Sequence, residues 1–135
     1  MPVLEPNQMS KPGPLIAIVD DDESIRRSVK RLMMSAGLRA ESYSSGQELL
    51  HAIKTNLPDC LVLDVQMPGM NGLEIQDRLA ASGIRVPIVF VTGYEDSMAE
   101  ARALKAGAAA FLYKPFSNRS LLEVVSTTVG WVKSV

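Results

Sequence analysis

The chain has 135 residues, of which 47% are apolar and 21% are charged, and its formal net charge is −1. A chain of this length forms one ordinary domain with its own hydrophobic core, and the composition is typical of a globular protein. The balanced charge argues against direct binding to nucleic acid or to a membrane surface. No apolar run approaches the length that crosses a bilayer, so we expect no membrane contact.

The single cysteine and the N-terminal segment indicate a cytoplasmic protein. Cys60 is the only cysteine, so no intramolecular disulfide can form, which fits a reducing compartment. It lies in an apolar run, which favours a buried and unreactive thiol. Residues 1–13 lack the basic and apolar regions of a signal peptide and are rich in proline and polar residues. We therefore expect a flexible leader over residues 1–13 and one domain over residues 14–135.

Five short apolar runs alternate with segments of helical periodicity after the leader. They predict strands over residues 15–19, 38–43, 60–65, 87–91 and 109–113. Three of these runs are nearly unbroken and rich in Val, Ile and Leu, which is typical of strands buried on both faces of a parallel sheet. The second run is more polar and alternating, which indicates an edge strand.

A helix is predicted after each strand. Ser45 and Glu48 form a predicted capping box at the start of the second helix. The resulting order, (βα)5 with short connections, predicts an α/β fold with a five-stranded, doubly wound parallel sheet. The residues that recur at helical spacing are Ile25, Val29, Leu32 and Met33; Leu49, Leu50 and Ile53; Leu73, Ile75, Gln76 and Leu79; Met98, Ala101 and Leu104; and Leu121, Leu122, Val124 and Val125.

The carboxyl ends of four predicted strands carry carboxylates, a hydroxyl and an ammonium group. In doubly wound sheets, ligands bind at this edge. Taken singly, Asp21 and Asp22 could cap the following helix. Thr92 could be an ordinary strand-end residue and Lys114 an ordinary surface lysine. Asp64 is harder to dismiss, because a carboxylate at the inner end of a buried strand is costly unless a positive group pairs with it. The occurrence of such residues at four strand ends favours one functional site. These residues are Asp20, Asp21 and Asp22 after the first strand, Asp64 at the end of the third, Thr92 after the fourth, and Lys114 after the fifth.

The types of side chain at these strand ends indicate phosphoryl chemistry with a hard cation. Carboxylates without cysteine or histidine suit Mg²⁺, and the only histidine, His51, lies on a predicted peripheral helix. A carboxylate such as Asp64 can attack phosphorus and form an acyl phosphate. Mg²⁺, the Lys114 ammonium and the Thr92 hydroxyl would then supply the positioning and charge neutralisation that make up most of the catalysis of this transfer.

Four segments resemble the signature blocks of response-regulator receiver domains of bacterial two-component signalling. They are IVDDDESIRRSV (18–29), LVLDVQMPGMNGLEI (61–75), VFVTGYED (89–96) and AGAAAFLYKPF (106–116). The blocks occur in the same order and at the same spacing, and the resemblance spans residues 14–133. The last two blocks look most like the branch whose members usually carry a C-terminal helix-turn-helix. The resemblance implies a flavodoxin-like fold with strand order 2-1-3-4-5.

The resemblance also implies roles for the individual residues. Mg²⁺ would be held by Asp20, Asp21, one oxygen of Asp64 and the main-chain carbonyl of Gln66. Asp64 would be phosphorylated by the phosphohistidine of a sensor histidine kinase or phosphotransfer protein. The peptide bond before Pro115 would be cis. We therefore expect a phosphorelay switch that catalyses its own phosphorylation and dephosphorylation, and not an enzyme acting on other substrates.

In such a switch, Thr92 turns toward the phosphoryl group and a buried aromatic side chain moves with it. The aromatic residue here is Phe111, whereas many relatives have a tyrosine, so it can still move inward but has no hydroxyl to form a hydrogen bond outside. We expect phosphorylation to change the surface formed by the fourth helix, the fifth strand and the fifth helix. Met98, Arg102 and Lys105 are candidate contacts there for a second copy or another partner.

Three other functions are less well supported by the same residues. An aspartate phosphatase needs a second Asp two residues after its nucleophile to protonate the leaving group, and Gln66 cannot do so. A flavodoxin-like electron carrier binds a phosphate in its first loop, which three aspartates would repel. The complete set of acids, threonine and lysine counts against a scaffold without catalytic function.

The resemblance also places Gln66 and Tyr94 beside the phosphoryl group. It leaves two possibilities for the chain, which is either a stand-alone regulator or part of a longer one.

Overall fold

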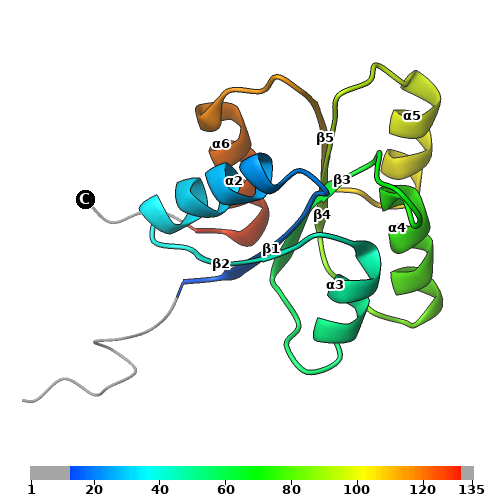
Figure 1. Cartoon of the computed structure of the whole chain (residues 1–135), viewed down its shortest axis with the longest axis horizontal. Coiled ribbons are helices and arrows are strands. Elements are labelled where there is room, and N and C mark those ends of the chain that lie inside the picture. Colours follow the sequence, from blue (N-terminus) through cyan, green and yellow to red (C-terminus); the bar gives the residue numbers. More distant parts are fainter. Residues whose placement is uncertain (1–12, 132–135) are drawn as a thin grey trace, which may run out of the picture.

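The computed structural model describes residues 13–131 as one parallel sheet covered by helices on both faces (Figure 1). The strands pair in the order β2-β1-β3-β4-β5, so the predicted fold and strand order are confirmed. The predicted leader lies outside the described residues except for Gly13. The strands are β1 (Leu15–Val19), β2 (Arg39–Tyr43), β3 (Cys60–Asp64), β4 (Ile88–Thr92) and β5 (Ala110–Tyr113).

Five helices connect and cover the strands. As Figure 1 shows, α2 and α6 cover one face of the sheet, and α3, α4 and α5 cover the other. Within residues 13–131, none of these helices has the length and apolar character that a bilayer span requires. The helices are α2 (Glu23–Ser35), α3 (Gly46–Ala52), α4 (Gly72–Ala81), α5 (Ser97–Lys105) and α6 (Asn118–Val129).

Successive residues of the central strands enter two separate apolar layers. Leu61 and Leu63 of β3 pack among residues of α3, α4 and α5, whereas Val62 packs among residues of α2 and α6. This two-sided burial explains why the central strands have unbroken apolar sequences. In β2, Ala40 is buried between exposed Arg39 and Glu41, so the predicted edge strand is confirmed.

The beginning of α3 has only half of the predicted capping box. The Ser45 hydroxyl accepts a hydrogen bond from the Glu48 backbone N–H at 3.2 Å, as expected. The Glu48 carboxylate, however, bonds the backbone N–H and the hydroxyl of Ser44, not the N–H of Ser45. A complete box that we did not predict lies at the start of α4, where Asn71 and Glu74 bond each other's backbone N–H groups.

The predicted apolar face of α5 is wrong. Met98, Ala101 and Leu104 are exposed, and the buried residues of this helix are Ala99 and Ala103. The helix is rotated relative to the prediction so that small side chains face the sheet, which lets its backbone lie close to the strands. The large apolar side chains point outward, and Met98 is 82% exposed.

The segment from β3 to α4 is folded tightly against the end of the strand. The Gly72 N–H donates to the Val65 carbonyl at 3.0 Å. A Cβ atom at Gly72 would lie 2.4 Å from the backbone oxygen of Asp64, which is closer than real Cβ contacts allow. Only glycine permits this approach, so the start of α4 helps to fix the end of β3 where Asp64 lies.

Candidate functional site

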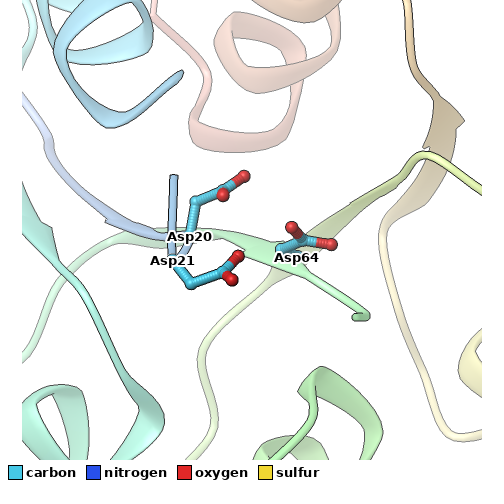
Figure 2. A group of neighbouring side chains, drawn as sticks. All are labelled: Asp20, Asp21 and Asp64. Atoms are coloured by element: carbon cyan, nitrogen blue, oxygen red, sulfur yellow. The ribbon is translucent and has the colours of Figure 1, made fainter. Parts of the chain in front are cut away.

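Asp64 ends β3 at the carboxyl edge of the sheet, where its carboxylate lies beside those of Asp20 and Asp21 (Figure 2). The residue is only 4% exposed. One carboxylate oxygen accepts a hydrogen bond from the Gln66 backbone N–H at 3.0 Å, which orients the side chain. The Gln66 side chain itself is exposed. The structure therefore brings a buried carboxylate to the edge that the sequence predicted.

The three consecutive acids after β1 have different surroundings. Asp20 is buried, and its Oδ1 accepts from the Asp22 backbone N–H at 2.9 Å. Asp21 is exposed, and one ligand atom each from Asp20, Asp21 and Asp64 lie within 4.8 Å of one another. Asp22 instead caps α2 by accepting from the backbone N–H groups of Ser24 and Ile25. The capping alternative therefore holds for Asp22, while Asp20 and Asp21 face the site.

Lys114 connects β5 to two of the acids. Its Nζ lies 2.9 Å from Asp20 Oδ2 and 3.1 Å from Asp64 Oδ2. Burial alone would lower the pKa of Lys114, but the hydrogen bonds and the charges of Asp20 and Asp64 outweigh it and raise the pKa. The lysine is therefore a fixed positive charge at neutral pH. Its peptide bond to Pro115 is cis, as the resemblance implied.

The acids carry more negative charge than the lysine neutralises. Burial and the neighbouring charge of Asp20 raise the pKa of Asp64, and Lys114 and the Gln66 N–H offset this only in part. Within residues 13–131, Asp20, Asp21 and Asp64 are the one group of acids, cysteines or histidines arranged to hold a metal ion. An oxygen-only donor set with excess negative charge fits a hard divalent cation such as Mg²⁺.

Thr92 ends β4 at the same edge of the sheet. It is buried, and its hydroxyl accepts a hydrogen bond from the Tyr94 backbone N–H at 3.3 Å. Tyr94 is 67% exposed, and its loop leads directly into α5. The Lys114 N–H donates to the Thr92 carbonyl at 2.7 Å, so Thr92 and the lysine are neighbours across the ends of β4 and β5.

Two contacts around the site were not anticipated from the sequence. The Arg26 guanidinium on α2 donates to the Asp20 carbonyl at 2.7 Å, which ties the first turns of that helix to the acidic loop. The only signal in the sequence is a basic residue about one helical turn after the acids. The Tyr113 hydroxyl donates to the Glu100 carboxylate, which joins β5 to α5. No short sequence pattern marks that pair, because it depends on where α5 lies.

The fold and this arrangement of strand ends agree with a sequence match over most of the chain. Residues 16–126 match the family described as the response regulator receiver domain. The chain belongs to this family. A receiver domain was therefore correctly identified from the four sequence blocks, and the acids, threonine and lysine that those blocks contain meet at one edge of its sheet.

Similar proteins include both longer regulators and separate receiver domains. Nodulation protein W of Bradyrhizobium diazoefficiens is 42% identical over 111 residues, which cover 82% of this chain and 49% of that protein. Transcriptional regulatory protein FixJ of Azorhizobium caulinodans is 35% identical over 115 residues, covering 85% of this chain and 54% of FixJ. The receiver thus spans about half the length of these curated relatives. They agree with the predicted resemblance to the branch whose members usually carry a C-terminal helix-turn-helix.

A solved receiver supports the fold independently. The crystal structure of a response regulator receiver protein from Burkholderia phymatum matches with a TM-score of 0.79 and 42% identity. The match covers 90% of this chain and 99% of that structure. The fold described above is therefore that of a receiver domain.

Proposed function

We propose that Asp64 of this receiver accepts a phosphoryl group from the phosphohistidine of a sensor histidine kinase or phosphotransfer protein. The observation that carries the proposal is the surroundings of Asp64: a buried carboxylate at a strand end, 3.1 Å from the Lys114 ammonium and beside Asp20 and Asp21. Membership of the receiver family supports the same role. The function is that of a signalling switch.

In the proposed reaction, a carboxylate oxygen of Asp64 attacks the phosphorus of phosphohistidine. The phosphorus–oxygen bond forms as the phosphorus–nitrogen bond breaks, and the imidazole leaves with that electron pair. The product is an acyl phosphate on Asp64. Lys114 and the Thr92 hydroxyl are suited to donate hydrogen bonds to the phosphoryl oxygens, where negative charge accumulates in the transition state. The protein contributes positioning and charge neutralisation.

We assign the metal-binding role to Asp20, Asp21, Asp64 and the main-chain carbonyl of Gln66. When bound, Mg²⁺ would neutralise charge on the phosphoryl oxygens. The excess negative charge of the three carboxylates supports the assignment, because a bound cation would offset both the burial and the repulsion by Asp20 that raise the pKa of Asp64. Asp20 and Asp64 are also held in place by Lys114, so two of the proposed ligands are already oriented.

We further propose that the signal is presented by the surface of α5, β5 and α6. Thr92 leads into α5, and the Phe111 ring lies against Phe90 with ring centroids 5.9 Å apart. Inward movement of Thr92 and Phe111 would repack this surface, which is a shift between two populations. Exposed Met98 is a candidate contact for a second copy. Arg102 is already paired with Asp77 of α4 at 2.6 Å, so such a contact would compete with that ion pair.

The proposed partners are thus a phosphohistidine donor and, on the output side, a protein or domain that reads the α5–β5–α6 surface. The relatives' greater length and the name of FixJ support control of transcription as the output. We propose no direct contact between this chain and nucleic acid.

Treatment with acetyl phosphate and Mg²⁺, followed by intact mass measurement, tests the proposed function. Wild type should gain one phosphoryl group, and a chelator should abolish the gain. Asp64→Asn should gain none. Asp22→Asn is the matched control, because Asp22 caps α2 and an asparagine caps equally well; it should behave as wild type. Labelling of Asp64→Asn at the wild-type rate would refute the assignment.

A further inference from the structure

The first turn of α5 is fastened to β5 by one tyrosine hydroxyl. Tyr113, the last residue of β5, donates from its hydroxyl to the Glu100 carboxylate, and the two oxygens lie 2.5 Å apart. The backbone N–H of Asp96, the N-cap residue of α5, also lies close to this hydroxyl. One side chain therefore fastens the first turn of this helix to β5 and lies beside its cap.

The same tyrosine adjoins two residues of the site. Tyr113 precedes Lys114 in the chain, and it is the register partner of Thr92 in the β4–β5 pair. The loop from Thr92 to Asp96 is only a few residues long, with the proposed switch residue at one end and a contact of Tyr113 at the other. Any shift of Thr92 toward Asp64 therefore acts on a segment that Tyr113 holds.

Polar contacts carry much of the attachment of α5. Its buried side chains are the small ones of Ala99 and Ala103, which remove little apolar surface from water. Among the described residues, its other polar ties are the bond from Gln76 of α4 to the Ala103 carbonyl and the pair of Arg102 with Asp77. With so little apolar burial, one hydrogen bond is a large part of what sets the position of the helix.

Tyr113 also supplies a hydroxyl on the face where Phe111 has none. The two rings lie on the same side of β5, with centroids 5.4 Å apart, and Phe111 also contacts Phe90. A change in the packing of Phe111 therefore reaches the Tyr113 ring by direct contact. The aromatic residue proposed to move, Phe111, and the residue whose hydroxyl bonds α5, Tyr113, are therefore two different side chains in this receiver.

We propose that the Tyr113–Glu100 hydrogen bond is a latch that holds α5 in the packing of the unphosphorylated receiver, and that it opens when Asp64 is phosphorylated. The claim that the bond opens on phosphorylation rests on the proposed function of Asp64. Before Thr92 and Phe111 can move inward, the latch keeps the first turn of α5 on β5. It thereby opposes the active packing until the phosphoryl group is in place.

Amide hydrogen exchange of the unphosphorylated protein tests the latch without any phosphoryl chemistry. The Tyr113→Phe variant loses only the hydroxyl. The Glu100 amide, which donates to the Asp96 carbonyl at 3.0 Å, should then exchange roughly three- to tenfold faster, as expected for the loss of one net hydrogen bond. Tyr43→Phe on β2 is the matched control and should leave this amide unchanged. Equal exchange in wild type and Tyr113→Phe would overturn the proposal.

Beryllofluoride, which mimics the phosphoryl group, tests the regulatory half in the presence of Mg²⁺. Tyr113→Phe should bind it roughly three- to tenfold more tightly, because activation no longer has to break the latch. Glu100→Gln keeps an acceptor oxygen and should bind like wild type. Faster exchange with unchanged affinity would show that the bond is only structural and would overturn the regulatory claim. If wild type failed to bind beryllofluoride at all, the phosphoacceptor assignment would fail, and the exchange result would still decide the latch.

Discussion

Nζ of Lys114 and Oδ2 of Asp64 lie 3.1 Å apart, although 50 positions separate the two residues in the chain. Lys114 follows β5, Asp64 ends β3, and β4 lies between these strands in the sheet. The contact therefore exists only in the assembled sheet, where the lysine reaches across the end of β4. The same ammonium bonds Asp20, so one cation partly neutralises a group of three carboxylates.

Replacement of Lys114 by Met should destabilise the receiver even though the apolar stem is kept. Asp20 and Asp64 would lose the only ammonium that bonds them among the described residues and would be left as buried, repelling carboxylates. We expect the free energy of unfolding without Mg²⁺ to fall by about 1–3 kcal/mol, as measured by urea denaturation. Lys54→Met, at an exposed position, is the control. Equal stability of the two variants would contradict the structural role of Lys114.

Mg²⁺ should stabilise the unphosphorylated receiver through Asp21. A cation that binds only the folded arrangement raises stability by mass action, by about 2.7 kcal/mol at a concentration a hundredfold above its Kd. Thermal unfolding should show a higher Tm in MgCl₂ than in NaCl of equal ionic strength. Asp21 is exposed, so Asp21→Asn should fold but lose most of this gain. If both salts shift Tm equally, or if Asp21→Asn responds like wild type, the metal assignment is wrong.

The lifetime of the phosphoryl group should depend on the bulk of Tyr94. Family resemblance places Gln66 and Tyr94 where water would approach the acyl phosphate. Shielding needs only volume, whereas activation of water by Gln66 would need close alignment, so we expect obstruction by the ring to dominate. Tyr94→Ser should shorten the half-life of the phosphorylated protein at equal Mg²⁺, and Tyr94→Phe should not. A serine variant that keeps its phosphoryl group as long as wild type would refute shielding.

Cys60 should be unreactive in the folded protein, and its thiol should make the free energy of unfolding fall as the pH rises in the alkaline range. Burial, with a smaller contribution from the charge of Asp59, raises the pKa of its thiol from 9.0 to about 12. The folded state thus retains a proton that the unfolded state loses. The contribution of the protonated Cys60 thiol to the free energy of unfolding is therefore fully present below about pH 9 and is lost as the pH rises through about 12.

Comparison with Cys60→Ala isolates this effect from the other titrating groups. Between pH 9 and 12, the stability of wild type should fall faster than that of the variant, by about 1.4 kcal/mol per pH unit. A thiol reagent at pH 8 should react with wild type only after denaturation. Parallel stability curves, or rapid native reaction, would show that the thiol is not buried as described.

The sheet and the meeting of the site residues could be predicted because their signals are local. The unbroken apolar run of each central strand indicates that the strand is buried on both faces. Because the strands are parallel, their carboxyl ends lie at one edge of the sheet. That edge therefore collects Asp20, Asp64, Thr92 and Lys114, independently of how the helices pack. The chemical roles of these residues stay predictions. Their positions follow from the order of strands alone.

The orientation of α5 and its contacts could not be predicted in the same way. In this short, alanine-rich helix, a face with Met98 and Leu104 and a face with Ala99 and Ala103 both fit helical spacing, so the choice depends on how close the helix comes to the sheet. The Tyr113 hydroxyl bond depends on that placement too. Likewise, which of three consecutive acids caps α2 is decided by the local backbone and not by residue type.

Identification of the modified residue tests the central claim most directly. Wild type is phosphorylated with acetyl phosphate or a phosphohistidine donor in Mg²⁺, and the acyl phosphate is reduced with borohydride, which converts a phosphorylated aspartate to homoserine. Peptide mass spectrometry then locates the change. We predict homoserine at position 64 and at no other aspartate. Homoserine at position 20 or 21, or a stable phosphoryl group on a hydroxyl side chain such as Thr92, would contradict the assignment of Asp64 as the phosphoacceptor.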